Sequence, residues 1–145
     1  MSILKRRVAA LAVGATVVLV GVPLSSGTAA ADIVSISCKT PDGGAIGKIL
    51  PIFQSKTSMV VGLGGTDSRA DGAYPRIRLD ITTAAGNRYT YPWREVKGGN
   101  GTVKTWDSTA THKDGIVSAR VEVQNFKGSS PVSTCYSART YNQYW

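Results

Sequence analysis

Turn-forming residues recur along most of this 145-residue chain, and their spacing constrains the fold more than any other feature. Clusters rich in Gly, Asp, Asn and Pro return after roughly 8 to 15 residues, and β-branched and aromatic residues fill the stretches between them. The clusters stand at 40–44, 62–72, 84–87, 97–101, 112–115 and 126–131. Short strands that alternate with turns predict an all-β fold, specifically a small antiparallel β-sandwich.

The stretches between the turns are expected to be strands. The clearest is 116–124, where Val and Ala at odd positions alternate with polar residues at even positions, which predicts one buried and one solvent-facing side. The stretch 48–56 has two interpretations, a strand interrupted by Pro51 or a short helical turn. The other expected strands are 33–39, 57–63, 76–83, 88–96, 102–106 and 132–138.

The first 31 residues have the three parts of a secretory signal peptide. Lys5, Arg6 and Arg7 form a positive start, an apolar stretch covers 8–22, and small residues at 29–31 provide a cleavage site. The apolar stretch of about 15 residues is shorter than the roughly 20 that span a bilayer. We therefore expect a cleaved signal at 1–31 and a single domain at 32–145. The product should be secreted and extracellular, without stable membrane insertion.

The chain has two cysteines, Cys38 and Cys135, near the two ends of the expected mature domain. In an oxidising compartment one pair of cysteines predicts a disulfide between them, and the final strand would then return beside the first. Two cysteines with a single distant histidine, His112, suit a zinc site poorly. We expect the disulfide, no metal site and no cofactor.

The hairpin expected over 76–96 has two possible registers, and they place the aromatic residues at 89, 91 and 93 on opposite faces. A four-residue loop would put these rings beside arginines as a stacking platform. A three-residue loop, 84–86, would bury them in the core, and Gly86 stands at the left-handed position that such a loop requires. We expect this second register, which pairs Ile81 with Tyr89, Leu79 with Tyr91 and Ile77 with Trp93.

This register predicts a basic, solvent-facing surface with Asp80 as its one acid. Pro92 lacks an amide hydrogen, so it suits an edge strand or a bulge, and an open edge could accept a partner's strand. Charge reversal at two of the arginines, 78 and 88, should then weaken partner binding without loss of stability. The arginines expected on this surface are Arg76, Arg78, Arg88 and Arg94, of which Arg76 and Arg94 would lie opposite each other.

The chain ends in an aromatic, polar tail that includes Tyr144 and Trp145. Such a tail either packs on its own domain or contacts a partner, and Tyr and Trp are favoured at protein interfaces. We therefore include both residues with the four arginines as expected partner-binding residues.

The inventory of reactive groups is poor, so we expect no catalytic residues and no enzyme. His112 lies in a turn-like stretch without a catalytic motif around it. The formal net charge is +8, of which three charges lie in the expected signal, and a moderately basic secreted domain suits acidic proteins or cell-wall polymers better than nucleic acid. A non-enzymatic protein-interaction module fits best. A lectin-like or cell-wall carbohydrate-binding module that uses exposed aromatics is the alternative, and a small hydrolase or nuclease fits least.

In outline the chain resembles the small secreted adaptor of bacterial umbrella toxin particles. The resemblance rests on the bacterial type of signal peptide, the size of the β-rich mature domain and the end-to-end cysteine pair. In those particles the adaptor joins a lectin subunit to a large toxin-bearing scaffold. The resemblance implies bacterial competition through assembly of a toxin complex, with the lectin subunit and the scaffold as partners, and it assigns no binding residues.

Overall fold

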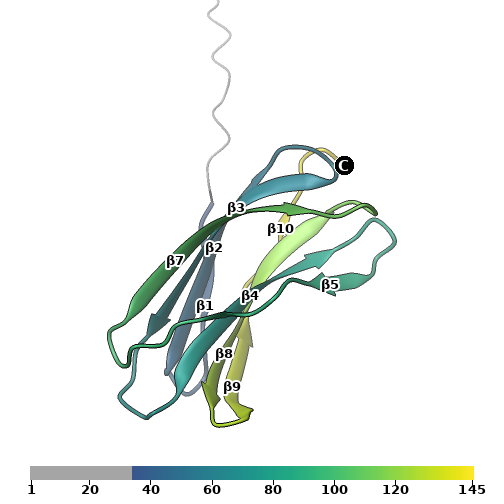
Figure 1. Cartoon of the computed structure of the whole chain (residues 1–145). Helices are drawn as coiled ribbons and strands as arrows, with labels where there is room; N and C mark the ends of the chain where they lie inside the picture. The colour runs from purple at the N-terminus through teal and green to yellow at the C-terminus, as the bar shows by residue number, and fades with distance from the viewer. Residues whose placement is uncertain (1–33) are drawn as a thin grey trace, which may run out of the picture. The chain divides into compact units, whose positions relative to one another are not determined.

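The computed structural model describes residues 34–145, so the expected signal peptide lies outside the described residues. All regular structure in this range is β-strand, arranged in two antiparallel sheets that face each other (Figure 1). This confirms the all-β sandwich. The strands are β1 (Ile36–Lys39), β2 (Ala45–Phe53), β3 (Ser58–Asp67), β4 (Tyr74–Thr82), β5 (Arg88–Thr90), β6 (Arg94–Glu95), β7 (Val103–Thr111), β8 (Ser118–Lys127), β9 (Ser130–Tyr136) and β10 (Thr140–Tyr141).

The first sheet has the order β1-β2-β3-β7, and the second is built around the long pair of β4 and β8. On the outer side of β8 lie β9 and β10, and on the outer side of β4 lie β5 and β6. One lateral side of the sandwich has β1 and β9, and the other has β7 opposite β5 and β6.

Both sheets contribute to one hydrophobic core, because each strand turns its alternate apolar residues toward the opposite sheet. Ile49, Met59 and Val61 come from the first sheet, and Ile77 and Val121 from the second, and all are buried. As expected, the odd positions of β8 face the core. The sheets approach each other closely at Gly47, where a Cβ atom would come within 2.3 Å of the Val123 side chain.

A disulfide between Cys38 and Cys135 closes one lateral side of the sandwich, as the sequence predicted. Cys38 lies on β1 and Cys135 on β9, so the bond joins the edges of the two sheets across a Cα–Cα distance of 6.2 Å. Both cysteines pack against the core. No covalent link holds the opposite side, where β7 faces β5 and β6, within the described residues.

The ambiguous stretch 48–56 lies mostly in β2, with Pro51 paired to Val61 of β3. β1 pairs with β2 only as far as Ile49, so Pro51 has a strand neighbour on one side alone. A proline is tolerated at such an edge because no ladder bond requires its missing N–H.

Some strand boundaries differ from those expected. β3 continues to Asp67, so part of the expected turn 62–72 is strand. Gly65 in this part of β3 packs closely against Val96: a Cβ atom on residue 65 would lie 2.7 Å from the Val96 side chain. β7 continues to Thr111, and β10 lies in what was expected to be tail. The segment 88–96 is two short strands with a break between them.

Candidate functional site

The hairpin between β4 and β5 has the expected three-residue loop. The amide of Thr83 donates to the carbonyl of Asn87 at 2.9 Å, and the amide of Gly86 donates to the carbonyl of Thr83 at 2.9 Å. Gly86 has φ = 79°, the left-handed conformation that glycine adopts without strain. Ile81 is paired with Tyr89, as predicted.

The expected register ends at Pro92. The amide of Tyr91 still donates to Leu79, as predicted, but Ile77 then pairs with Arg94 and Arg76 with Glu95. One extra residue has entered the second strand, which is a β-bulge, and Pro92 has no N–H with which to continue the ladder. The predicted pairs Ile77–Trp93 and Arg76–Arg94 are therefore wrong.

The bulge separates the three aromatics that the sequence analysis placed together in the core. Tyr91 packs against the core, and its hydroxyl donates to the carbonyl of Thr111 at 2.9 Å. Tyr89 stays 45% exposed at the end of the sheet, in edge contact with Tyr91 and His112. Trp93 turns to the outer face, where it stacks with arginines. The core prediction was right for Tyr91 and wrong for Trp93 and for the exposed Tyr89.

Five arginines gather on the outer face of the second sheet, which we call the arginine face. It consists of Arg76, Arg78, Arg88, Arg120 and Arg139. Arg94 does not belong to it, because pairing with Ile77 places Arg94 on the side of the first sheet. The expected basic surface is thus correct for three of its four arginines.

Two buried carboxylates lie beneath the arginines, where only Asp80 was expected. Asp80 accepts hydrogen bonds from Arg88 Nε at 2.9 Å and Arg120 Nε at 2.8 Å, and Arg139 Nη2 lies 3.4 Å from its second oxygen. Glu122, the second acid, accepts from Arg78 Nε at 2.7 Å and Arg88 Nη2 at 2.6 Å. The Asp80 side chain is 0% exposed and that of Glu122 is 3% exposed. The arginines therefore form a layer over the sheet and its two acids.

Arg78 and Arg88 are accordingly not free solvent-facing charges. Burial lowers the pKa of the Arg88 guanidinium, but the charges of Asp80 and Glu122 outweigh burial and raise that pKa overall. Charge reversal at Arg78 and Arg88 would place two new carboxylates beside two buried ones. We therefore expect such a change to destabilise the domain, in place of the unchanged stability expected from the sequence.

Arg76 differs from its neighbours because no carboxylate within the described residues lies at ion-pair distance from it. Its Nε donates to Gln124 Oε1 at 2.7 Å. Its guanidinium carbon lies 3.6 Å from the centre of the Phe126 ring and 4.5 Å from the centre of the Trp93 ring. Arg78 also stacks on Trp93, at 4.2 Å. Guanidinium–aromatic contacts of this kind are favourable and hold the charge in a fixed plane.

The C-terminal tail packs on its own domain. Trp145 Nε1 donates to the carbonyl of Ile116 at 2.9 Å, and the indole lies against Gly115, where a Cβ would approach it to 2.5 Å. The buried Asn142 donates to the carbonyls of Ile116 and Ser55, at 2.8 Å each. Tyr144 and Trp145 nevertheless remain about half exposed, at 45% and 53%. Their expected contact with a partner stays a prediction.

His112 lies in the turn between β7 and β8, and its Nδ1 accepts from the amide of Asp114 at 3.2 Å. Over residues 34–145, no group of three or more His, Cys, Asp or Glu side chains is placed to hold a metal ion. In the same part of the chain, no helix could span a membrane.

Sequence reasoning missed Arg120, Glu122 and Arg139 as members of the arginine face. The first two occupy polar positions of the strand predicted over 116–124, and pairing that strand with 76–83 would have brought them beside Arg78. Arg139 lies outside every predicted strand, so no pattern indicated it. Comparison with known proteins does not extend these findings: no family model, curated protein or solved structure matches the chain.

Proposed function

We propose that this chain is a secreted, non-enzymatic adaptor whose arginine face binds an acidic surface of a partner protein. The observation that carries the proposal is the arginine face itself, where, among residues 34–145, five arginines lie over two buried carboxylates. The excess of positive charge on one face would attract an acidic partner over a distance and speed its association.

Pre-organisation supports a binding role for this face in addition to its structural one. Arg78 and Arg88 are fixed by buried acids, and Arg76 is held between Trp93 and Phe126. A guanidinium that is already ordered loses little side-chain entropy when it pairs with a carboxylate of a partner. Arginine and aromatic side chains are also the residue types that carry most binding energy at protein interfaces.

The resemblance to the adaptor of umbrella toxin particles supplies a setting for the proposal. An adaptor of that type would contact both a lectin subunit and a large scaffold, and the arginine face would serve one of these contacts. The protein would then take part in bacterial competition through assembly of a toxin complex. The disulfide suits an oxidising extracellular environment and so agrees with secretion.

The proposal can be tested by capture from medium in which the natural producer has grown. The bait is the tagged mature domain, as wild type, as Arg76→Gln, and as Lys113→Gln, which removes an equal charge from an 86% exposed side chain outside the arginine face. We expect wild type and Lys113→Gln to retain the same acidic protein, and Arg76→Gln to retain at least about tenfold less, a loss of one charge-assisted contact. Equal retention by all three baits, or retention of polysaccharide alone, would contradict the proposal.

A further inference from the structure

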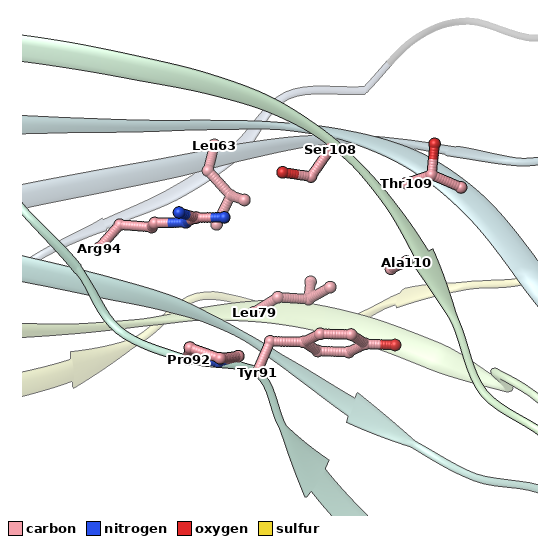
Figure 2. Close-up of a pocket in the computed structure, with 8 residues that line it drawn as sticks. All are labelled: Leu63, Leu79, Tyr91, Pro92, Arg94, Ser108, Thr109 and Ala110. Atoms are coloured by element: carbon pink, nitrogen blue, oxygen red, sulfur yellow. The ribbon is translucent and has the colours of Figure 1, made fainter.

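The side of the sandwich opposite the disulfide contains a pocket of about 170 Å³, which we call the lateral pocket. Leu63 and Leu79 line it from the two sheets, together with Tyr91 and Ala110. Arg94 and Ser108 complete the part of the lining used here. Figure 2 shows the Arg94 guanidinium extending toward Leu63, while the Tyr91 ring lies below Ala110.

The pocket follows from the bulge at Pro92 and from small residues on β7. The bulge turns Trp93 to the outer face, so Tyr91 is the one aromatic residue in the pocket lining. Across from it, β7 contributes three small residues to the lining, Ser108, Thr109 and Ala110. The result is a hollow with a mixed apolar and polar lining, at an edge that no covalent bond closes within residues 34–145.

Arg94 is the one charged side chain among the described residues that line the pocket. No acidic side chain of residues 34–145 lies within ion-pair distance of Arg94. Burial, with a smaller effect from Tyr89, raises the pKa of Tyr91 to about 12, so its phenol is neutral at physiological pH. The Tyr91 hydroxyl is already engaged as a donor to Thr111. The pocket thus combines apolar side chains with polar groups from β7, and its one cation, the exposed Arg94, has no carboxylate paired with it among the described residues.

We propose that the lateral pocket binds a small carboxylic acid with a compact apolar body, such as a single aromatic ring, with its carboxylate on Arg94. The size agrees, because an apolar protein cavity of about 150 Å³ accommodates benzene. The planar guanidinium can pair with a carboxylate through two parallel hydrogen bonds. Ser108 offers a hydroxyl beside the same position. This site goes beyond the proposed adaptor function and does not depend on it.

The proposal is tested by NMR titration of the mature domain with sodium phenylacetate and with its neutral counterpart, phenylacetamide. We expect saturable shifts of the Leu63, Leu79 and Ala110 methyl signals with phenylacetate, with a dissociation constant of about 1 mM or lower. Phenylacetamide should bind at least about tenfold more weakly, because it lacks the charge.

Two variants and a control locate the site. Arg94→Gln should weaken phenylacetate about tenfold, to the level of phenylacetamide. Ser108→Leu, which fills the hollow, should weaken both ligands. Lys104→Gln removes a charge from β7 outside the pocket lining and should change neither affinity. The proposal is overturned if phenylacetate causes no saturable shifts at the lining residues up to about 20 mM, well above the expected constant. It is also overturned if Arg94→Gln binds like wild type, or if the shifts fall on the arginine face.

Discussion

Arg94 lies opposite Ile77 in the antiparallel pair of β4 and β6, one residue out of step with the pairing between β4 and β5. This offset has consequences on both faces of the second sheet. On the outer face it brings Trp93 beneath the guanidinium groups of Arg76 and Arg78. On the inner face it leaves Arg94 in the lining of a pocket. The candidate protein-binding surface and the candidate ligand site therefore both depend on the bulge at Pro92.

The β4–β5 loop should depend on the backbone conformation of Gly86. We expect Gly86→Val to lower the free energy of unfolding by about 1–2 kcal/mol, because a β-branched residue is strained at positive φ. No steric clash of the Cβ adds to this strain, since a Cβ at this position would meet no atom within 4 Å. Gly86→Asn is the control, because Asn tolerates the left-handed conformation better, and it should cost less. Urea unfolding of the three proteins measures the difference, and a neutral Gly86→Val would contradict this interpretation of the loop.

The two buried acids should make Arg88 more important for stability than Arg76. Arg88 contacts both Asp80 and Glu122, so Arg88→Gln leaves two buried carboxylates with fewer donors. We expect a loss of about 2 kcal/mol, below the cost of breaking a fully buried pair because the Arg88 side chain is 45% exposed. Arg76→Gln removes stacking and one hydrogen bond to the neutral amide of Gln124 and leaves no buried carboxylate unpaired, so it should cost about 1 kcal/mol. Equal unfolding midpoints for the two variants would show that the acids do not need Arg88.

The disulfide should account for a large share of the stability of this small domain. It closes a loop between residues 97 positions apart, for which the chain-entropy model gives about 4.7 kcal/mol at 100 residues. We expect the Cys38→Ala/Cys135→Ala double variant to lose about 2–5 kcal/mol relative to the oxidised protein. Denaturant unfolding of wild type with and without reductant provides the matching comparison. Unchanged stability after reduction would contradict the role assigned to the bond.

The carboxylate of Asp42 should make the folded domain less stable when it is protonated in acid. Burial raises its pKa, but hydrogen bonds with Thr40, Asn125 and the amide of Gly44, together with the charge of Arg69, outweigh burial and lower it below the ordinary 3.8. A lowered pKa in the folded state contributes stability that is present above the ordinary value and is lost as pH falls through the folded value.

We therefore expect the unfolding free energy of wild type to fall more steeply below about pH 4 than that of Asp42→Asn. Asp107→Asn, which changes an exposed carboxylate on β7, is the control and should follow wild type. Urea unfolding from about pH 5 to about pH 2 measures the slopes. Parallel curves for wild type and Asp42→Asn would refute the assignment.

Much of the fold could be predicted because the local patterns and the tertiary structure agree. The alternation in 116–124 gives the buried face of β8, and Gly86 selects the loop and with it the pairing of Ile81 with Tyr89. The cysteines indicate which edges of the sheets meet. In each case the residues that indicate a feature, in β8, in the β4–β5 loop or on the two edge strands, belong to that feature themselves.

The arginine face could be predicted only in part because it depends on contacts between distant strands. Glu122 lies 34 residues from Arg88 in the chain, and only the pairing of β4 with β8 brings them together. Pro92 indicates an edge strand or a bulge, but a proline alone does not show whether the extra residue enters before or after it. That choice decides the faces of Trp93 and Arg94, so their positions required the structure.

The adaptor proposal is tested most directly by the rate at which the captured partner associates with the domain. We would measure the association rate constant for wild type, Arg76→Gln and Lys113→Gln, from about 50 mM to about 500 mM salt, a range over which screening of exposed charges becomes nearly complete. The account predicts that the wild-type and Lys113→Gln rates fall about tenfold or more over this range, with a slower rate and a weaker salt dependence for Arg76→Gln. A rate that is the same for all three proteins and independent of salt would contradict it.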